Sequence, residues 1–231
     1  MTSHQVIVTE DLTKTYSAND VPVYALRGIN LTITAGEFTA IVGPSGSGKT
    51  TFLNIISGLD QPTEGKVWLS EELLLNMSGR QLSDFRRDNI GFVFQAYNLI
   101  PVLTVGENIE YIMLLQGIPK LERHQRVVDI LEVVGLAGYI DRKPPQLSGG
   151  QQQRVAIARA MVSQPTIILA DEPTANLDSK TGSELLDMMY QLNKRTGMTF
   201  VFSTHDQTVM DRAQRLITLK DGLIDNDNVR E

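Results

Sequence analysis

The chain has 231 residues and a formal net charge of −6 at neutral pH, from 21 lysine and arginine residues against 27 aspartate and glutamate residues. The absence of cysteine excludes a disulfide scaffold, a thiolate zinc site and a cysteine nucleophile, and it favours the cytosol. The acidic balance argues against a broad nucleic-acid surface, so we expect no direct nucleic-acid binding.

The length suits one large domain, or a core with a smaller subdomain. The first residues lack the pattern of a secretory signal, and no apolar run approaches the roughly 20 residues that span a bilayer. We therefore expect a chain that does not cross a membrane by itself. Residues 221–231, DGLIDNDNVRE, are predicted to form a polar tail.

Short β-type runs alternate with helical patterns, which predicts an α/β fold. These runs are QVIVTEDL (5–12), INLTIT (29–34), FTAIVG (38–43), KVWLS (66–70), IGFVFQ (90–95), TIILAD (166–171), TFVFST (199–204) and RLITLKDG (215–222). The third, sixth and seventh runs are almost wholly apolar, as expected of central parallel strands covered on both faces. The early runs alternate more, which is typical of half-exposed antiparallel strands.

The strand pattern disappears after Gln95 and returns only after residue 163. The segments with helical periodicity are TVGENIEYIMLLQGI (104–118) and KLERHQRVVDILEVVGL (120–136). We interpret residues 96–163 as a helical subdomain inserted into a core of residues 1–95 and 164–231. Thr104 and Glu107 are spaced as a capping box, and we expect the nearby residues Met113, Leu114 and Leu115 to pack in the core.

The run GPSGSGKT, residues 43–50, matches the pattern G-x-x-x-x-G-K-[ST] between a predicted strand and a predicted helix. This order argues against a chance glycine turn. Backbone amides of such a loop surround phosphates, Lys49 reaches the β- and γ-phosphates, and the Thr50 hydroxyl binds Mg²⁺. The predicted nucleotide-binding residues here are Gly43, Pro44, Ser45, Gly46, Ser47, Gly48, Lys49, Thr50 and Thr51.

Polar residues follow other predicted strands. Asp171 ends TIILAD and Glu172 follows it; Asp171 would hold Mg²⁺ and Glu172 would act as general base. An acidic pair at a strand end usually lies in a cap or turn, but the phosphate loop favours the catalytic interpretation. His205 follows TFVFST on the edge where parallel strands carry ligands, and could contact a γ-phosphate. Gln95 lies where the core meets the helical region.

The run LSGGQQQR, residues 147–154, precedes a helical pattern. Ser148 and Gln151 have the spacing of a capping box. Gly149 and Gly150 leave backbone amides uncovered at the helix start, which suits an anion. The pattern predicts an anion site separate from the phosphate loop in sequence.

In this order, the motifs GPSGSGKT, Gln95, LSGGQ, ILADEP, NLD and His205 resemble those of the ATP-binding-cassette (ABC) ATPase family across nearly the whole chain. The resemblance implies ATP and Mg²⁺ as ligands, with Lys49, Glu172 and His205 in catalysis. It implies a P-loop core with an antiparallel β-subdomain and the helical insertion.

The resemblance also assigns roles that the motifs alone do not. Residues 148–151 would bind the γ-phosphate of an ATP held by another subunit. Tyr16 would stack on adenine, Gln95 would contact Mg²⁺ or water, and Asp178 would lie in a loop that crosses the dimer interface.

The function that the resemblance implies is that of an ATPase subunit. It would close as a head-to-tail, ATP-bridged homodimer and drive a separately encoded permease at the cytoplasmic face of the plasma membrane, and it would be soluble when isolated. Residues 16–67 and 86–109 look like the lipoprotein-release (LolD-type) and macrolide-export (MacB-type) branch. Other interpretations are an importer ATPase or a non-transport ATPase of cell division or iron–sulfur assembly, whereas Glu172 and His205 disfavour a non-catalytic nucleotide binder.

The contact with the permease is predicted around AYNLIPVLTVGENI, residues 96–109, because the stretch after Gln95 is unusually apolar for a loop. Burial inside the helical subdomain is the alternative for Leu99 and Leu103.

Overall fold

The computed structural model describes residues 4–18 and 21–230. Within them the chain forms a six-stranded sheet of order β10-β9-β3-β8-β7-β6 and a four-stranded sheet of order β2-β1-β4-β5. The larger sheet contains β3 (Phe38–Val42), β6 (Ile90–Val93), β7 (Ile167–Asp171), β8 (Thr199–Thr204), β9 (Arg215–Lys220) and β10 (Leu223–Val229). The smaller contains β1 (Gln5–Ala18), β2 (Val21–Thr34), β4 (Glu64–Leu69) and β5 (Glu72–Leu73).

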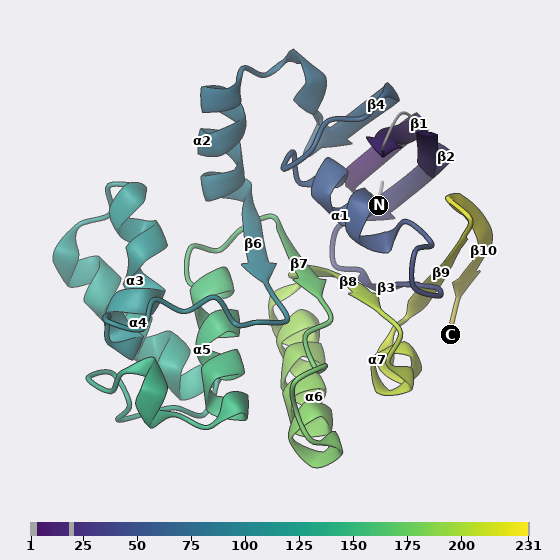
Figure 1. Ribbon diagram of the computed structural model, residues 1–231. Helices are drawn as coiled ribbons and strands as arrows, with labels where there is room; N and C mark the ends of the chain where they lie inside the picture. Colours follow the sequence, from purple (N-terminus) through teal and green to yellow (C-terminus); the bar gives the residue numbers. More distant parts are fainter. Residues whose placement is uncertain (1–3, 19–20, 231) are drawn as a thin grey trace.

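Helices cover the sheets and form a separate group at one side (Figure 1). They are α1 (Lys49–Ile56), α2 (Gly79–Asn89), α3 (Val105–Leu115), α4 (Lys120–Val133), α5 (Gly149–Met161), α6 (Ser179–Thr196) and α7 (Gln207–Arg212), with 3-10 turns at Leu74–Asn76 and Pro144–Gln146. Among the described residues, no helix is long and apolar enough to cross a membrane.

The centre of the larger sheet is parallel, as the apolar runs predict. β3 pairs in parallel with β8 and β9, and β7 pairs in parallel with β6 and β8. Every residue of β3 and β8 is buried. Because the strands run in one direction, their carboxyl ends meet at one edge, and the loops that follow them can build one site.

Alternate residues of these strands serve two cores. Ile41, Ile167 and Val201 face a cluster with α1 and the antiparallel sheet. Phe38, Phe200 and their neighbours face a cluster with α5, α6 and α7. Helix α1, which begins at the phosphate loop, therefore lies between the two sheets, and its position depends on both (Figure 1).

A third cluster joins α3, α4 and α5, the helices of the predicted insertion. Both capping boxes form, at Ser148 and at Thr104. Met113 is buried, but the prediction of core packing is wrong for Leu114 and Leu115, whose exposed fractions are 50% and 53%. Successive residues of an α-helix point about 100° apart, so the face of α3 that packs against α4 and α5 includes Met113 but not its next two neighbours.

The predicted polar tail is also wrong, because residues 223–229 form β10, an antiparallel strand beside β9. Arg215 on β9 binds Asp227 of β10 through two short hydrogen bonds of 2.8 and 2.7 Å, and its third nitrogen reaches Glu37. Ile224 packs against the main core. A polar segment is thus ordered by backbone pairing and an arginine 12 residues away.

Candidate functional site

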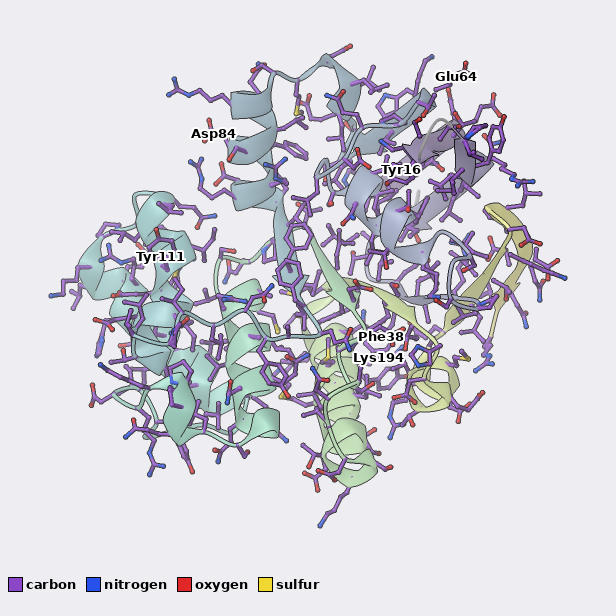
Figure 2. All side chains as sticks on the ribbon, in the orientation of Figure 1. Tyr16, Phe38, Glu64, Asp84, Tyr111 and Lys194 are labelled. Atoms are coloured by element: carbon purple, nitrogen blue, oxygen red, sulfur yellow. The ribbon has the colours of Figure 1, made fainter. Side chains whose placement is uncertain are left out.

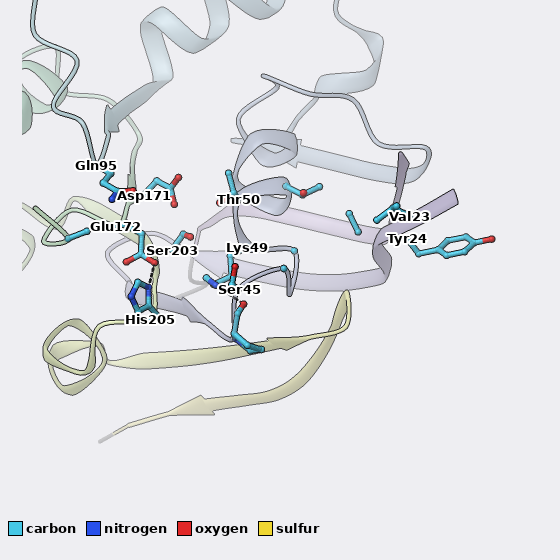
Figure 3. Close-up of a pocket in the computed structure, with 16 residues that line it drawn as sticks. Val23, Tyr24, Ser45, Lys49, Thr50, Gln95, Asp171, Glu172, Ser203 and His205 are labelled. Atoms are coloured by element: carbon cyan, nitrogen blue, oxygen red, sulfur yellow. Dashed lines mark hydrogen bonds and ion pairs between the residues drawn. The ribbon is translucent and has the colours of Figure 1, made fainter. Parts of the chain in front are cut away.

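The loop of residues 43–50 joins the end of β3 to the start of α1 (Figure 3). Gly43 has φ 150° and Gly48 has φ 105°, in the left-handed region that favours glycine. A Cβ atom at Gly43 would also collide with the carbonyl oxygen of Leu219, and one at Gly48 would collide with the carbonyl oxygen of Ala25. Both positions therefore require glycine, and the loop brings backbone amides to the surface of a pocket.

The side chain of Lys49 lies across this loop. Its Nζ atom donates to the carbonyl oxygens of Gly43, at 2.8 Å, and Pro44, at 3.0 Å. These partners are neutral, so the ammonium charge has no carboxylate neutralising it at hydrogen-bond distance among the described residues. A phosphate oxygen beside the loop would supply that missing charge.

A pocket of about 660 Å³ opens beside the loop (Figure 3). Many predicted site residues line it: Pro44, Ser45, Gly46, Gly48, Lys49, Thr50, Thr51, Gln95, Asp171, Glu172 and His205. The predicted site residues that do not line it are Tyr16, Gly43, Ser47, Ser148, Gly149, Gly150, Gln151 and Asp178. The pocket thus collects residues from the phosphate loop and from the carboxyl ends of β6, β7 and β8.

Other lining residues escaped the sequence interpretation: Val23, Tyr24, Ala25, Ala175 and Ser203. Ser203 is the next-to-last residue of the run TFVFST, so the strand-end argument that selected His205 could have found it. Val23 and Tyr24 carry no motif, and only the pairing of β2 with β1 brings them to the pocket. The ring of Tyr24 points away from Lys49 (Figure 3).

Asp171 is the last residue of β7, and Ser203 lies opposite it on β8. Burial raises the pKa of Asp171, and the charge of Glu172 raises it further, while the Ser203 hydroxyl and Lys49 act in the opposite direction. A carboxylate in this position is stabilised by an additional cation.

The donor set around Asp171 fits Mg²⁺. The Thr50 hydroxyl, the Gln95 amide and the Asp171 carboxylate line the same pocket, and all offer oxygen. Mg²⁺ prefers oxygen ligands and is usually held by one or two carboxylates with substrate phosphates. The described residues contain no cluster of three or more His, Cys, Asp or Glu side chains that could hold a metal ion.

Glu172 is held by residues at the carboxyl end of β8. His205 Nδ1 lies 2.6 Å from Oε1, and the Thr204 hydroxyl donates to Oε2 at 3.1 Å. The backbone amide of Glu172 donates to the Ser203 carbonyl at 2.9 Å, and its φ is 46°, an uncommon value for a residue other than glycine. The strained backbone and both contacts point the carboxylate into the pocket (Figure 3).

The predicted anion site begins α5. Ser148 Oγ accepts from the Gln151 amide at 3.3 Å, and Gln151 Oε1 accepts from the Ser148 amide at 3.0 Å. These residues do not line the pocket of their own phosphate loop. Asp178 caps α6, where a hydrogen bond from the Thr181 hydroxyl and backbone amides lower its pKa.

Helix α5 binds the segment that follows Gln95 through hydrogen bonds from Arg159. Arg159 donates from Nη2 to the Tyr97 carbonyl at 2.9 Å and from Nη1 to the Asn98 carbonyl at 2.5 Å. Both acceptors have positive φ, at 59° and 50°. Burial lowers the pKa of Arg159. Asn176 adds a hydrogen bond of 2.8 Å to the Gln95 carbonyl.

A phosphate loop between a parallel strand and a helix, with two acids at the end of another parallel strand of the same sheet, defines a P-loop ATPase. A family model described as ABC transporter matches residues 26–175, and the chain belongs to that family. It is an ATP-binding, ATP-hydrolysing cassette, and the α/β P-loop fold expected from the sequence is confirmed.

Two similar proteins of comparable length are named ABC transporter ATP-binding proteins. An uncharacterized ABC transporter ATP-binding protein of Thermotoga maritima is 47% identical over 96% of this chain and 94% of its own length. The protein MJ0796 of Methanocaldococcus jannaschii is 46% identical over 96% of both chains. The macrolide export ATP-binding/permease protein MacB of Brucella melitensis is 44% identical over the whole chain, which spans 35% of MacB.

Solved structures show the same fold. A dimeric structure of a post-hydrolysis state of MJ0796, bound to ADP and Pi, superposes with a TM-score of 0.89 at 45% identity, covering 97% of this chain and 99% of that one. The roles of individual site residues stay predictions.

Proposed function

We propose that this chain is the ATPase of a permease encoded separately, and that two copies close head to tail around two ATP molecules. One observation carries the proposal: residues 148–151 form the N-terminus of α5, a position that favours anions, yet they lie outside the pocket of their own phosphate loop. A second copy would complete the site. Dimeric structures of the similar cassette MJ0796 support this arrangement.

The chemistry would be divided among the residues of the pocket. The loop amides and Lys49 bind the phosphates, and Thr50, Gln95 and Asp171 would hold Mg²⁺, which supplies charge neutralisation on the phosphate oxygens. Glu172 accepts the proton of the attacking water, and His205 and Thr204 fix its carboxylate.

The serine at residue 148 of the partner copy would donate to the γ-phosphate, so closure depends on the triphosphate. Hydrolysis removes this contact, which lowers the preference for the closed dimer. The energy would thereby reach the permease as a conformational change.

An apolar surface supports a permease contact beside the pocket. Val102 is 71% exposed and Ile100 is 39% exposed, on the segment after Gln95. Tyr111, Leu114 and Leu115 on α3 are also exposed, and Figure 2 labels Tyr111. Leu99, by contrast, packs against the core of the helical group. The segment after Gln95 therefore has one residue packed in the helical core, Leu99, and two exposed apolar residues, Ile100 and Val102.

The export proteins among the relatives, MacB and the pyoverdine exporter PvdT, support an efflux or lipoprotein-release role, with the chain peripheral at the cytoplasmic face of the plasma membrane. The test is co-purification of the tagged chain from detergent-solubilised membranes, together with ATPase assays of the isolated chain and of the complex. We expect Mg²⁺-dependent hydrolysis, an ATP-dependent dimer and a co-purifying integral membrane protein that stimulates turnover. A chain that hydrolyses ATP fully as a monomer, with no membrane partner, would overturn the proposal.

A further inference from the structure

Three side chains form a cluster beside the pocket, on the side of the antiparallel sheet and α1, where Figure 2 labels Tyr16. The Lys14 ammonium donates to Asp60 Oδ1 at 2.7 Å, and the Tyr16 hydroxyl donates to Asp60 Oδ2 at 2.8 Å. Lys14 Nζ also lies over the Tyr16 ring, 4.8 Å from its centroid. We call these residues the Lys14–Tyr16–Asp60 cluster.

The cluster links the antiparallel sheet to helix α1, and both elements contribute residues to the pocket. Tyr16 on β1 pairs with Val23 on β2, and Val23 lines the pocket. Asp60 follows α1, and its amide donates to the Asn54 carbonyl of that helix at 3.1 Å. The carboxylate therefore ties the ring on β1 to the helix that begins at the phosphate loop.

The Asp60 carboxylate is strongly held. Partial burial raises its pKa, but hydrogen bonds from Lys14, Tyr16 and the Gln61 amide outweigh this and keep the pKa below its usual value. The Lys14 side chain is only 13% exposed and donates a second hydrogen bond to the Gln61 carbonyl at 2.7 Å. These hydrogen bonds hold the Lys14 ammonium and the Asp60 carboxylate in place.

The Tyr16 ring is thus fixed at its hydroxyl by one partner and covered on one face by the other. Even so, 39% of the residue is exposed. An aromatic ring with one covered face and one exposed face beside a phosphate pocket is a stacking platform for a flat base.

We propose that Asp60 and Lys14 are positioning residues for the nucleotide base, because they hold the Tyr16 ring at the height and tilt at which its uncovered face stacks on adenine. The inference rests on the proposed function, since it requires that the pocket binds ATP and that Tyr16 meets the base. Asp60 and Lys14 act through the ring and do not touch the nucleotide.

The test compares a ligand with a base and one without. Equilibrium binding of ADP and of inorganic pyrophosphate, both with Mg²⁺, is measured for the wild type, Tyr16→Ala, Asp60→Ala and the double variant. Because base stacking on aromatic side chains is strong, we expect Tyr16→Ala to weaken ADP binding by about tenfold or more. Asp60→Ala should weaken ADP binding by about three- to tenfold and leave pyrophosphate binding within about twofold of wild type.

The double variant separates positioning from a general structural effect. Residues that act through one another are not additive, so Asp60→Ala should cause no further loss in the Tyr16→Ala background. Asp60→Asn keeps an acceptor for the Tyr16 hydroxyl and should recover part of the ADP affinity; being almost isosteric, it also serves if Asp60→Ala does not fold. Lys66→Met, which removes a similar ammonium from the ring of Trp68 in the same sheet, is the matched control and should change neither ligand.

Three results would overturn the inference: Asp60 variants that bind ADP as tightly as wild type, equal losses for ADP and pyrophosphate, or additive losses with Tyr16→Ala. The proposed function fails separately. A wild-type chain that binds neither ligand would refute the nucleotide pocket itself, whereas normal wild-type binding with any of the three results would refute only the positioning role.

Discussion

His205 faces Glu172 through Nδ1, 2.6 Å from the carboxylate oxygen Oε1. An ionised carboxylate only accepts hydrogen bonds, so the imidazole carries a proton on Nδ1 in this arrangement. In the neutral ring Nε2 is then an acceptor and cannot donate to a phosphate. The predicted contact of His205 with a γ-phosphate would therefore require either the imidazolium or a ring that has turned away from Glu172.

Replacement of Glu172, the proposed general base, gives the first prediction. Glu172→Gln keeps the shape and the acceptor for Thr204 but cannot take a proton, so turnover should fall by about 10²–10⁴-fold. ATP binding should persist, and the trapped dimer should elute early in size-exclusion chromatography with ATP. Hydrolysis at the wild-type rate would show that another residue removes the proton.

His205→Ala tests the contact itself. The variant leaves Glu172 with one of its two side-chain partners, so we expect kcat to fall by about ten- to a hundredfold while ATP affinity changes little. Thr204→Val, which removes the other partner, is the matched comparison. A variant whose only defect is weaker ATP binding would assign His205 to binding alone.

The shared site predicts complementation between two inactive chains. A subunit with Lys49→Ala and a subunit with Ser148→Arg each form homodimers without an intact site, whereas the mixed dimer has one intact site. Mixing should raise the ATPase rate above that of either parent, toward about half of the wild-type rate at most. Confirmed mixed dimers without any recovery would contradict independent composite sites.

Variants in the segment after Gln95 can distinguish a role in binding the permease from a role in core packing. Val102→Glu should leave the isolated chain folded and able to bind ATP but should abolish co-purification with the permease, since this side chain is 71% exposed. Leu99→Glu places a charge against the helical core and should lower the free energy of unfolding by about 1–3 kcal/mol. The checks are thermal unfolding, ATP binding and permease capture. A Val102→Glu chain that still couples normally would move the permease surface elsewhere.

The lowered pKa of Asp206 predicts that the free energy of unfolding decreases at acidic pH. Partial burial raises its pKa, but hydrogen bonds from Thr174 and Thr208 outweigh this and lower it. Since the folded pKa lies below the unfolded value of about 3.9, the stabilisation is complete above that value and is lost as pH falls through the folded pKa. Asp206→Asn retains a helix cap but no charge, so it should be less stable than wild type by about 1 kcal/mol at pH 7.

The comparison with wild type at low pH checks the sign. Urea unfolding near pH 3 should show a smaller difference between the two proteins than at pH 7, because below about pH 3.9 the unfolded wild-type chain takes up a proton at Asp206. A difference that stays constant across this range would show that the charge does not contribute. Thr174→Val, which removes the donor at 2.7 Å, should reduce the same pH dependence.

The parts of the fold that the sequence predicts well are those buried on both sides. β3, β7 and β8 lie within one residue of the apolar runs, because a strand covered on both faces needs a continuous apolar sequence. The candidate site could be predicted for the same reason, since parallel strands bring their following residues to one edge. Asp171, Glu172 and His205 meet there although 34 positions separate the first from the last.

The missed elements depend on contacts between distant residues. Helix α2 was not predicted, because most of its residues are polar or charged and only Leu82 is buried in it; the capping box of Ser78 and Gln81 was the available signal. Strand β10 depends on Arg215. Lys14 and Asp60, 46 positions apart, have no spacing that would predict their ion pair.

Because Arg159 binds the segment after Gln95, a movement of that segment can tilt α5 and displace its other end. Ser148 lies at one end of this 13-residue helix and Arg159 near the other, so the arm is about 15–20 Å long. A tilt of about 5° at the Arg159 end moves the far end by roughly 1.5 Å, which is enough to make or break a hydrogen bond to a phosphate. In the proposed dimer, a small displacement of the segment after Gln95 would therefore move Ser148 relative to the nucleotide that the other copy holds.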